Sequence, residues 1–373
     1  MKTILLTGVT GQVVSELAIF LQNEGWRILY LIRPKDEKTA QMRLAEVLPK
    51  IREGMDIAIE GDVTLPHGGV SFENIALWRG KIDIILHGAA AISFEEKDAG
   101  DVWHTNVGGT KNMLELADIL NVTDFHYIST AYIAGNAKVF NETDLDIGQV
   151  SFNSYELSKI ASEKLVHDWK GGSFTVYRLP TVLGRSIDGK VLTFHSYYGF
   201  FIPFWRMRKN WYRRWLADYQ KCTDDGVTFD EKDVMNIPLF IDCSQESVLN
   251  MVTVDWVALM MYELLKIPSS GQAYHLVHTN PMKVSSVIEV SLRYLGINCI
   301  ERGTKPLPLL TKIQDSINVN TKIYQQYIKH GCIFTCDNLV NTLGDKYVQH
   351  TDVDETTLGT MLGYSMAVDF GKK

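Results

Sequence analysis

Three side chains in the first half of the chain have the types and spacing for proton transfer to a carbonyl group. Tyr155 and Lys159 stand four residues apart, which places a phenol and an ammonium on one face of a predicted helix. A free tyrosine titrates near ~10, and a neighbouring cation lowers that pKa by stabilising the phenolate. Such a tyrosine can protonate a carbonyl oxygen as hydride arrives, and Thr130, just beyond a predicted strand, can polarise the same oxygen. The set predicts oxidoreduction at a carbonyl group, with Lys159 also holding the ribose of a nicotinamide.

A glycine turn near the start of the chain is suited to a pyrophosphate. The predicted strand Thr3–Leu6 leads into the turn Thr7–Val14, in which Gly8 and Gly11 stand three residues apart. Glycines at this spacing allow a tight turn that brings backbone N–H groups against the pyrophosphate, at the positive end of the next helix. Val14 occupies the usual third glycine position, so we expect close packing of helix against strand to be harder here.

The residues after the second predicted strand favour NADPH. An NAD site has an acidic residue there for the ribose hydroxyls, but this chain has Arg33 and Lys35. A 2′-phosphate needs a cation, and a guanidinium offers it a forked donor. Arg43, one helical stretch further on, can return to the same phosphate. Asp36 and Glu37 follow closely enough to keep NAD open.

Short apolar strands alternate with helices and must position these residues. The predicted strands are Thr3–Leu6, Arg27–Leu31, Ile57–Glu60, Ile82–His87, Asp124–Ile128 and Phe174–Tyr177, and the predicted helices are Gln12–Gln22, Thr39–Glu46, Asn106–Leu120 and Ser154–Trp169. Strands separated by helices pair in parallel, so we expect an α/β fold: a Rossmann-type doubly wound parallel sheet with a smaller, mostly helical C-terminal substrate lobe. The expected domains are residues 1–190 for cofactor binding, with a return to the sheet near 249–278, and 191–373 for the substrate lobe and C-terminal region.

Composition excludes several classes of protein. The chain has 373 residues, of which 22% are charged and 46% hydrophobic, which excludes a disordered chain, a collagen and a coiled coil. The net charge, 37 minus 44 or −7, argues against nucleic-acid binding. No apolar run reaches the ~18 to 20 residues of a membrane span. Five cysteines without a Cys-x-x-Cys pair favour reduced thiols and a cytoplasmic location.

Together the motifs resemble the extended short-chain dehydrogenase/reductase superfamily over about residues 1–297. Within it the chain is most similar to the thioester reductases: male-sterility-type fatty acyl-CoA reductases, and reductase domains of carboxylic acid reductases and nonribosomal peptide synthetases. The segments that carry the resemblance are Thr7–Gly11, Ile32-Arg33, Arg43-Leu44, Gly61–Thr64, His87–Ala90, Asn106–Thr110, Ser129–Tyr132, Tyr155–Lys159, Arg178–Pro180, Gly184–Gly189 and Val252–Val257. The Arg33/Arg43 spacing, Ile92–Phe94 and Ser129–Tyr132 favour the thioester branch.

The resemblance implies a role for each matching residue. Thr130, Tyr155 and Lys159 would be catalytic, and the last two would also contact the cofactor. The other implied cofactor-binding residues are Thr7, Gly8, Thr10, Gly11, Gln12 and Val13 in the glycine turn, Arg33 and Arg43 at the 2′-phosphate, Asp62 and Val63 beside the adenine, Gly88, Ala89 and Ala90 beneath the cofactor, Asn106 behind the site, and Pro180, Thr181 and Val182 beside the nicotinamide.

The implied function is NADPH-dependent reduction of an acyl thioester to an aldehyde, and with a second hydride to an alcohol. The implied substrates are acyl-CoA or an acyl group on the phosphopantetheine of an acyl carrier protein. Two alternatives stay open: a sugar-nucleotide epimerase/dehydratase or ketone/aldehyde reductase of the same superfamily, and an NADP-binding regulator without turnover. Homodimers are common in the superfamily, but nothing in this chain specifies one.

Two further features have competing interpretations. The segment Trp205–Trp215 mixes five cations with four aromatic residues; it suits a lid or docking surface for phosphate-bearing carriers, peripheral contact with a membrane, or a structural helix. Cys332 and Cys336 have the spacing of a metal pair on a helix. Since no second Cys or His pair accompanies them, we predict no metal site.

Overall fold

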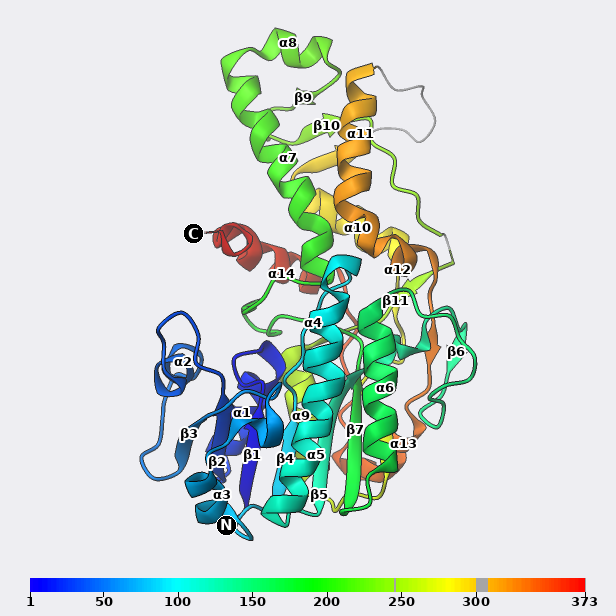
Figure 1. Cartoon of the computed structure of the whole chain (residues 1–373). Coiled ribbons are helices and arrows are strands. Elements are labelled where there is room, and N and C mark those ends of the chain that lie inside the picture. The colour runs from blue at the N-terminus through cyan, green and yellow to red at the C-terminus, as the bar shows by residue number, and fades with distance from the viewer. Residues whose placement is uncertain (245, 300–307, 373) are drawn as a thin grey trace. The chain divides into compact units, whose positions relative to one another are not determined.

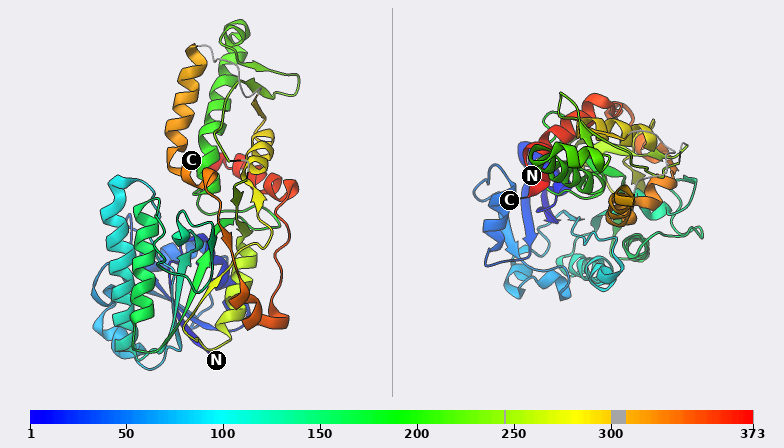
Figure 2. Two further views of the ribbon diagram at one scale, coloured as in Figure 1. Left: turned by 90° about the vertical axis from the view of Figure 1, so that its right-hand side faces the viewer. Right: turned by 90° about the horizontal axis from the view of Figure 1, so that it is seen from above.

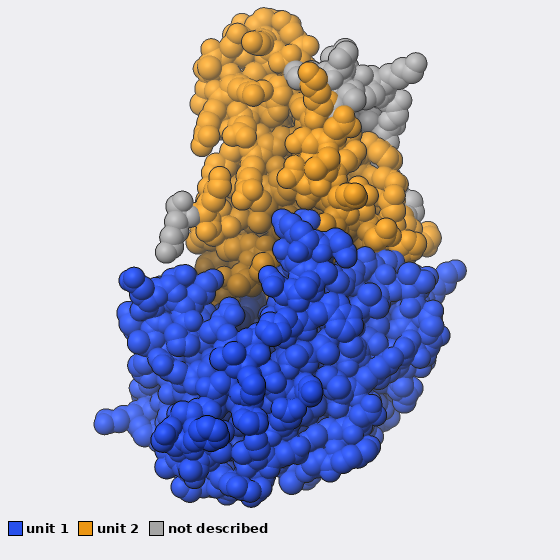
Figure 3. Space-filling model, in the orientation of Figure 1, with its two compact units in different colours: residues 1–182, 252–279, 333–350 blue, residues 183–251, 280–332, 351–373 orange. Residues whose placement is uncertain are grey.

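A computed structural model describes residues 1–244, 246–299 and 308–372 and divides the chain into two compact units (Figure 3). Unit 1 comprises Met1–Val182, Val252–Thr279 and Ile333–His350, and unit 2 comprises Leu183–Met251, Asn280–Cys332 and Thr351–Lys373. Residues 333–350, expected in the C-terminal region, belong to unit 1.

Unit 1 is built on a seven-stranded parallel sheet with the strand order β13-β7-β5-β4-β1-β2-β3. Its strands are β1 (Thr3–Thr7), β2 (Arg27–Ile32), β3 (Asp56–Glu60), β4 (Ile84–His87), β5 (Asp124–Thr130), β7 (Ser173–Leu179) and β13 (Gln272–His275). The order reverses between β1 and β4, and ligands of such sheets bind beyond the carboxyl ends of the strands at this point. The predicted Rossmann-type fold is confirmed.

Helices cover both faces of this sheet (Figures 1 and 2). Helices α5 and α6 pack together on one face, and α1 packs against α9 on the other. The helices of unit 1 are α1 (Gln12–Asn23), α2 (Ala40–Val47), α3 (Phe72–Trp78), α4 (Ala99–Trp103), α5 (Gly109–Leu120), α6 (Ser154–Asp168), α9 (Val254–Leu265) and α13 (Asp337–Leu343). A π-helical turn, His104–Gly108, joins α4 to α5, so the helix expected from Asn106 starts with irregular geometry.

The core of unit 1 follows from the apolar patterns in the sequence. The β1 residues Ile4, Leu5 and Leu6 are fully buried, as expected for a strand with helices on both faces. The predicted apolar face of α5, which includes Met113 and Ala117, is buried against the sheet. These elements fix the edge of the sheet that carries the predicted site.

The late segment Ile333–His350 joins unit 1 through backbone pairing and a buried carboxylate. Its strand β16 (Ile333–Phe334) pairs in parallel with β6 (Val139–Phe140). The Glu142 carboxylate accepts hydrogen bonds from the backbone N–H groups of His275, Asn338 and Leu339, and so caps the start of α13. This carboxylate therefore ties α13 to β13.

Unit 2 is mostly helical around one apolar core. Its aromatic residues Tyr197, Phe201 and Phe204 come from α7 and are buried together. Its helices are α7 (Tyr197–Ala217), α8 (Tyr219–Asp224), α10 (Val284–Tyr294), α11 (Pro308–Thr321), α12 (Gln325–Lys329) and α14 (Glu355–Ala367). Its strands are β9 (Thr228–Phe229), β10 (Met235–Ile237), β11 (Val248–Leu249), β14 (Met282–Lys283) and β15 (Ile297–Cys299), and the short strands β8 (Thr181–Leu183) and β12 (Met251–Thr253) lie at the unit boundaries in the sequence. Within the described ranges, none of the helices combines the length and the apolar character that a membrane crossing requires.

Candidate active site

All predicted site residues lie in unit 1, and several of them end or directly follow strands of the parallel sheet. Thr7 ends β1, Thr130 ends β5, and Pro180 follows β7. Because parallel strands end at one edge of a sheet, residues distant in sequence meet there. The glycine turn and the residues Thr130, Tyr155 and Lys159 therefore all belong to the region of unit 1 around these strand ends.

The glycine turn has the shape that an anionic group requires. Gly8 has φ +84°, and a Cβ on it would come within 2.6 Å of the Gly88 carbonyl carbon and 2.7 Å of the Ala89 nitrogen. Gly11 caps α1 without any side-chain hydrogen bond to the first N–H groups of the helix. Such N–H groups form an anion site at the positive end of a helix, so this turn fits a pyrophosphate.

The valine at the third glycine position has a matching partner. Val14 is buried, and a Cβ added to Gly88 would lie only 2.6 Å from Val14 Cγ2. The extra volume of Val14 is therefore accommodated by the missing side chain of Gly88. The expected difficulty in packing α1 against the sheet does not arise, because the space is provided by the loop after β4.

The loop after β4 is held by the Thr7 hydroxyl. Its oxygen accepts hydrogen bonds from the backbone N–H groups of Gly88 and Ala89, at 3.1 and 3.0 Å. It also lies 2.8 Å from Nδ1 of His87, and burial lowers the pKa of His87 to about 3. The ring is therefore neutral at physiological pH, and the Thr7 hydroxyl donates to Nδ1. Thr7 and His87 position the segment Gly88–Ala90 rather than supply charge.

The cationic residues after β2 lie beside Asp62. Arg33 Nη1 is 3.5 Å from an Asp62 carboxylate oxygen, and Arg43 donates a hydrogen bond to the backbone oxygen of Arg33. Burial alone would raise the pKa of Asp62, but hydrogen bonds from Thr64 and the charge of Arg33 lower it. The Arg33 side chain is 57% exposed, which leaves donors available for a phosphate.

Asp36 and Glu37, which kept NAD open in the sequence, form the tip of an exposed tight turn. Both have positive φ, at 50° and 63°, and the backbone hydrogen bonds between Lys35 and Lys38 close the turn. Val63, predicted beside the adenine together with Asp62, packs against Gly109 at the start of α5.

The Tyr155–Lys159 pair lies on α6, which packs against β5. Lys159 is 3% exposed, and its ammonium donates hydrogen bonds to the Tyr127 hydroxyl at 3.0 Å and the Ile128 carbonyl at 2.7 Å. Tyr155 is 9% exposed and packs against the Phe94 ring, with centroids 5.8 Å apart. A buried, hydrogen-bonded cation therefore lies one helical turn from a phenol.

The pKa of Tyr155 differs from the sequence expectation. Burial raises it, and this effect exceeds the lowering caused by the Lys159 charge. Burial likewise lowers the pKa of Lys159. The sequence showed the neighbouring cation but not the loss of solvent, which stabilises the neutral phenol that proton donation requires.

Thr130 lies at the end of β5, the strand whose Ile128 holds Lys159. Its hydroxyl donates to the Leu179 carbonyl at 3.2 Å and accepts from the Tyr132 N–H at 3.2 Å. Tyr132 in turn lies 2.7 Å from the hydroxyl of Thr181, in the segment predicted beside the nicotinamide. These contacts link β5 to the residues after β7.

Asn106 lies in the π-helical turn and supports α6. Its side-chain amide donates to the Ala91 carbonyl and the Ser158 hydroxyl and accepts from the Ala91 N–H, at 2.8 to 3.1 Å. Ser158 also donates to the Tyr155 carbonyl at 2.7 Å. Isolated π-helical turns are frequent at functional sites. The supporting roles of Ser158 and Tyr127 were not predicted from the sequence. The position of Ser158 between Tyr155 and Lys159 could have indicated its role, whereas we find no such signal for Tyr127.

The cysteines do not form a metal centre within the described residues. None of the five cysteines forms a disulfide, and no group of three or more potential ligands occurs in that part of the chain. Burial raises the pKa of Cys336 to about 11, which disfavours the thiolate that a metal requires.

Solved structures with the same fold include reductase domains. The terminal R domain of the myxalamid PKS-NRPS pathway is 22% identical, with a TM-score of 0.76 over 99% of this chain and 92% of that one. The Bordetella bronchiseptica enzyme WbmH, in complex with NAD+, is 16% identical, with a TM-score of 0.60 over 98% of this chain and 99% of that one. At these identities the similarity establishes the fold.

Curated relatives are similar over part of the chain. "Fatty acyl-CoA reductase wat" of Drosophila melanogaster is 30% identical over 178 residues, covering 43% of this chain and 34% of the relative. Human "Fatty acyl-CoA reductase 1" is 32% identical over 157 residues, covering 38% of this chain and 30% of the relative. The matched segments span about a third of the length of these relatives.

The family comparison covers more than half of the chain. The NAD-binding family described as male sterility protein matches residues 6–261, from β1 into α9. This match includes the glycine turn and the Thr–Tyr–Lys set, and it supports an oxidoreductase with a nicotinamide cofactor. The chain belongs to the male sterility protein family, in the thioester reductase branch of the extended short-chain dehydrogenase/reductase superfamily.

Proposed function

We propose that this protein is an NADPH-dependent reductase that converts acyl thioesters to aldehydes. One observation carries the proposal: Lys159, buried and hydrogen-bonded to β5, lies one helical turn from Tyr155, on an element packed against the strand that ends at Thr130. This arrangement brings a proton donor, a cation and a hydroxyl to the carboxyl edge of a dinucleotide-binding sheet. The named activities of the relatives direct the proposal toward thioesters.

Arg33 and Arg43 support NADPH as the cofactor. Both guanidinium groups belong to the region beyond β2, where the ribose of a bound dinucleotide lies in this fold. A 2′-phosphate would meet the exposed donors of Arg33, while Asp62 holds the same guanidinium in place. The glycine turn would hold the pyrophosphate through the first N–H groups of α1.

Each residue of the catalytic set has a separate task. Bound NADPH supplies a hydride to the thioester carbon. Tyr155 gives its phenolic proton to the substrate oxygen, and Lys159 stabilises the phenolate that remains. Thr130 donates a hydrogen bond to the same oxygen without transferring its proton, and for this it must exchange its present acceptor, the Leu179 carbonyl. Release of the thiol from the resulting hemithioacetal gives the aldehyde, and a second reduction would give the alcohol.

The proposed substrates are acyl-CoA and acyl groups on carrier proteins, and unit 2 is the proposed substrate lobe. A thiolation-reductase di-domain from an archaeal non-ribosomal peptide synthetase has a similar fold, with a TM-score of 0.72 and 18% identity, and this supports the proposal of a carrier-bound substrate. Unit 2 supports this assignment because it holds the cationic segment of α7.

The test is an assay of NADPH consumption across acyl-CoA chain lengths and acyl-carrier thioesters, with products identified by mass spectrometry. We expect aldehyde or alcohol in amounts that match the NADPH consumed. Release of tightly bound NAD(H) from purified protein, with turnover of sugar nucleotides, would instead identify an epimerase or dehydratase. NADPH binding without turnover of any thioester or carbonyl substrate would identify a regulator.

A further inference from the structure

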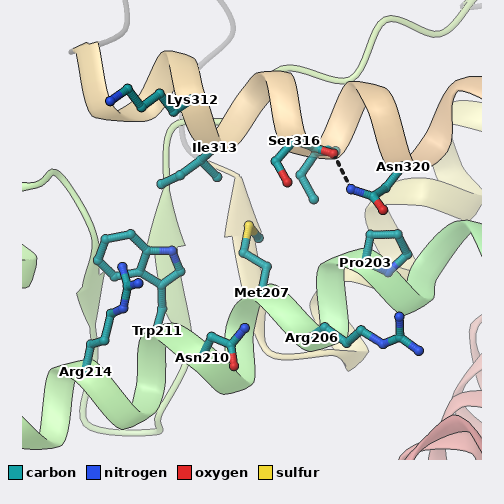
Figure 4. A pocket seen from close by; sticks show the side chains of 11 residues that line it. Pro203, Arg206, Met207, Asn210, Trp211, Arg214, Lys312, Ile313, Ser316 and Asn320 are labelled. Atoms are coloured by element: carbon teal, nitrogen blue, oxygen red, sulfur yellow. Dashed lines mark hydrogen bonds between the residues drawn. The ribbon is translucent and has the colours of Figure 1, made fainter.

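A cationic groove lies inside unit 2, between helices α7 and α11, which run antiparallel (Figure 4). Its volume is about 350 Å³, within the range of small-molecule sites. The residues that line it are Pro203, Arg206, Met207, Asn210, Trp211 and Arg214 of α7 and Lys312, Ile313, Ser316, Ile317 and Asn320 of α11. None of these lining residues is acidic, although the chain as a whole carries a formal charge of −7.

The cations stand at both ends of the groove. Arg214 and Lys312 lie at one end, beside Trp211, and Arg206 lies at the other end, beside Pro203 (Figure 4). Arg214 follows Arg206 by eight positions of helix, a rise of about 12 Å. The paired cations Arg214 and Lys312 therefore suit the end of a ligand that carries more than one phosphate group.

These cations are available for a ligand. Within the described part of the chain, Arg206, Arg214 and Lys312 form no ion pair with a carboxylate, and all three are exposed. Lys209 on the same helix differs, because both oxygens of the Asp369 carboxylate lie 2.7 Å from its ammonium. The Arg214 guanidinium lies over the Trp211 ring, 5.0 Å from its centroid, so an aromatic contact orients it.

The middle of the groove combines apolar and amide groups. Met207 and Ile313 face each other across it, and Asn210, Ser316 and Asn320 provide polar side chains (Figure 4). Such a lining suits a flat, partly polar ring with hydrogen-bonding edges. An adenine ring has this chemistry.

We propose that this groove binds the 3′-phosphoadenosine diphosphate end of coenzyme A. The proposal rests on the proposed function, since an acyl-CoA substrate would present this group. The 3′-phosphate and the pyrophosphate of coenzyme A are both carried on the ribose, so they would lie together at the Arg214 and Lys312 end of the groove, with adenine against Met207 and Ile313. The concave shape and small volume favour a nucleotide over the broad surface of an acidic carrier protein.

The test measures binding of coenzyme A to the full chain by calorimetry, with NADPH at saturation so that the glycine turn is occupied. The probes are coenzyme A, its 3′-dephospho form and pantetheine. The groove variant is Arg214→Gln with Lys312→Gln. The matched control is Arg213→Gln, because this neighbouring arginine is exposed on the same helix and lines a different hollow.

We expect coenzyme A to bind at least tenfold more tightly than pantetheine. The groove variant should weaken coenzyme A binding about tenfold, from about threefold for each exposed cation. It should raise KM for acyl-CoA by the same factor at unchanged kcat and leave acyl-pantetheine kinetics unaltered. In the Arg213→Gln control, the affinity for coenzyme A and KM for acyl-CoA should both stay within twofold of the wild-type values.

Three results would overturn the assignment. They are equal affinity for coenzyme A and pantetheine, a groove variant whose affinity for coenzyme A is within twofold of the wild type, and a groove variant that weakens the binding of an acyl carrier protein but not of coenzyme A. Since binding is measured without turnover, the groove and the proposed function can fail separately. If the chain binds coenzyme A through Arg214 and Lys312 but reduces no thioester, the coenzyme A site stands and the proposed reductase function is refuted.

Discussion

Replacing Tyr127 by Phe should move the alkaline limb of the pH–rate profile to lower pH. Tyr127 is fully buried, and its hydroxyl is one of two hydrogen-bond acceptors that the structure gives the Lys159 ammonium. Its loss leaves one N–H of a buried cation without that acceptor. Hydrogen bonds to charged groups contribute about 1.5 to 3 kcal/mol, and about 1.4 kcal/mol corresponds to one pKa unit. The pKa of Lys159, already lowered by burial, should therefore fall further.

The assay is kcat/KM for thioester reduction between pH 6 and pH 10. The proposed mechanism needs protonated Lys159, so the alkaline loss of activity should begin about one to two pH units earlier in Tyr127→Phe than in the wild type. Tyr177→Phe is the matched control, because Tyr177 is equally buried but its hydroxyl contacts His126 Nδ1 at 2.7 Å. A folded Tyr127→Phe enzyme whose alkaline limb coincides with that of the wild type would refute the reasoning, as would an equal shift in Tyr177→Phe.

Three further predictions concern the turn, the cofactor and stability. Gly8→Ala should lower the free energy of unfolding in urea by about 2 to 4 kcal/mol, because the new Cβ would meet the Gly88 backbone at 2.6 Å. Gly25→Ala is the control, since Gly25 has a similar φ but open space around it, and should lower the free energy of unfolding by only about 1 kcal/mol. Equal losses in the two variants would contradict the steric argument. Arg33→Ser should raise KM for NADPH about tenfold and leave KM for NADH unchanged, whereas Lys35→Ser should change neither KM. An equal rise in KM for NADH in Arg33→Ser would contradict a contact between Arg33 and the 2′-phosphate. Burial raises the pKa of Glu142 to about 7 from its ordinary 4.5, so the folded state binds the proton more tightly, and wild-type stability should fall as pH rises from about 4.5 to about 7. Glu142→Gln has no titratable group at this position and should lose that pH dependence. An unchanged pH slope in the variant would exclude Glu142 as its source.

The parts of the fold that local patterns specify could be predicted from the sequence. Strands such as β1 and β5 are short apolar runs, and α5 has an apolar face at helical spacing, so their positions agree to within a few residues. The glycine turn and the Tyr155–Lys159 spacing are equally local. Their convergence follows from parallel pairing alone, since all these strands end at one edge.

Contacts between distant segments could not be predicted. The pairing of β16 with β6, and the Glu142 carboxylate that accepts N–H groups from α13, join residues nearly 200 positions apart. Neither end has a pattern that identifies its partner. The structure therefore includes Ile333–His350 in unit 1, although the sequence had no basis for that assignment.

Burial changed two chemical expectations for the candidate site. The pKa of Tyr155 rises despite Lys159, because the effect of lost solvent exceeds that of one neighbouring charge. Val14 fits beside the sheet because Gly88, over seventy residues later, has no side chain. Both effects depend on what surrounds a residue in space, which spacing along the chain does not reveal.

The most direct test of the account is a single-turnover reaction of an acyl-CoA with NADPH carrying deuterium at the transferred position. The account predicts an aldehyde with one deuterium at its carbonyl carbon, formed by the wild-type chain and at least about a hundredfold more slowly by Tyr155→Phe. An aldehyde without deuterium, or equal rates in the two proteins, would contradict hydride transfer assisted by Tyr155.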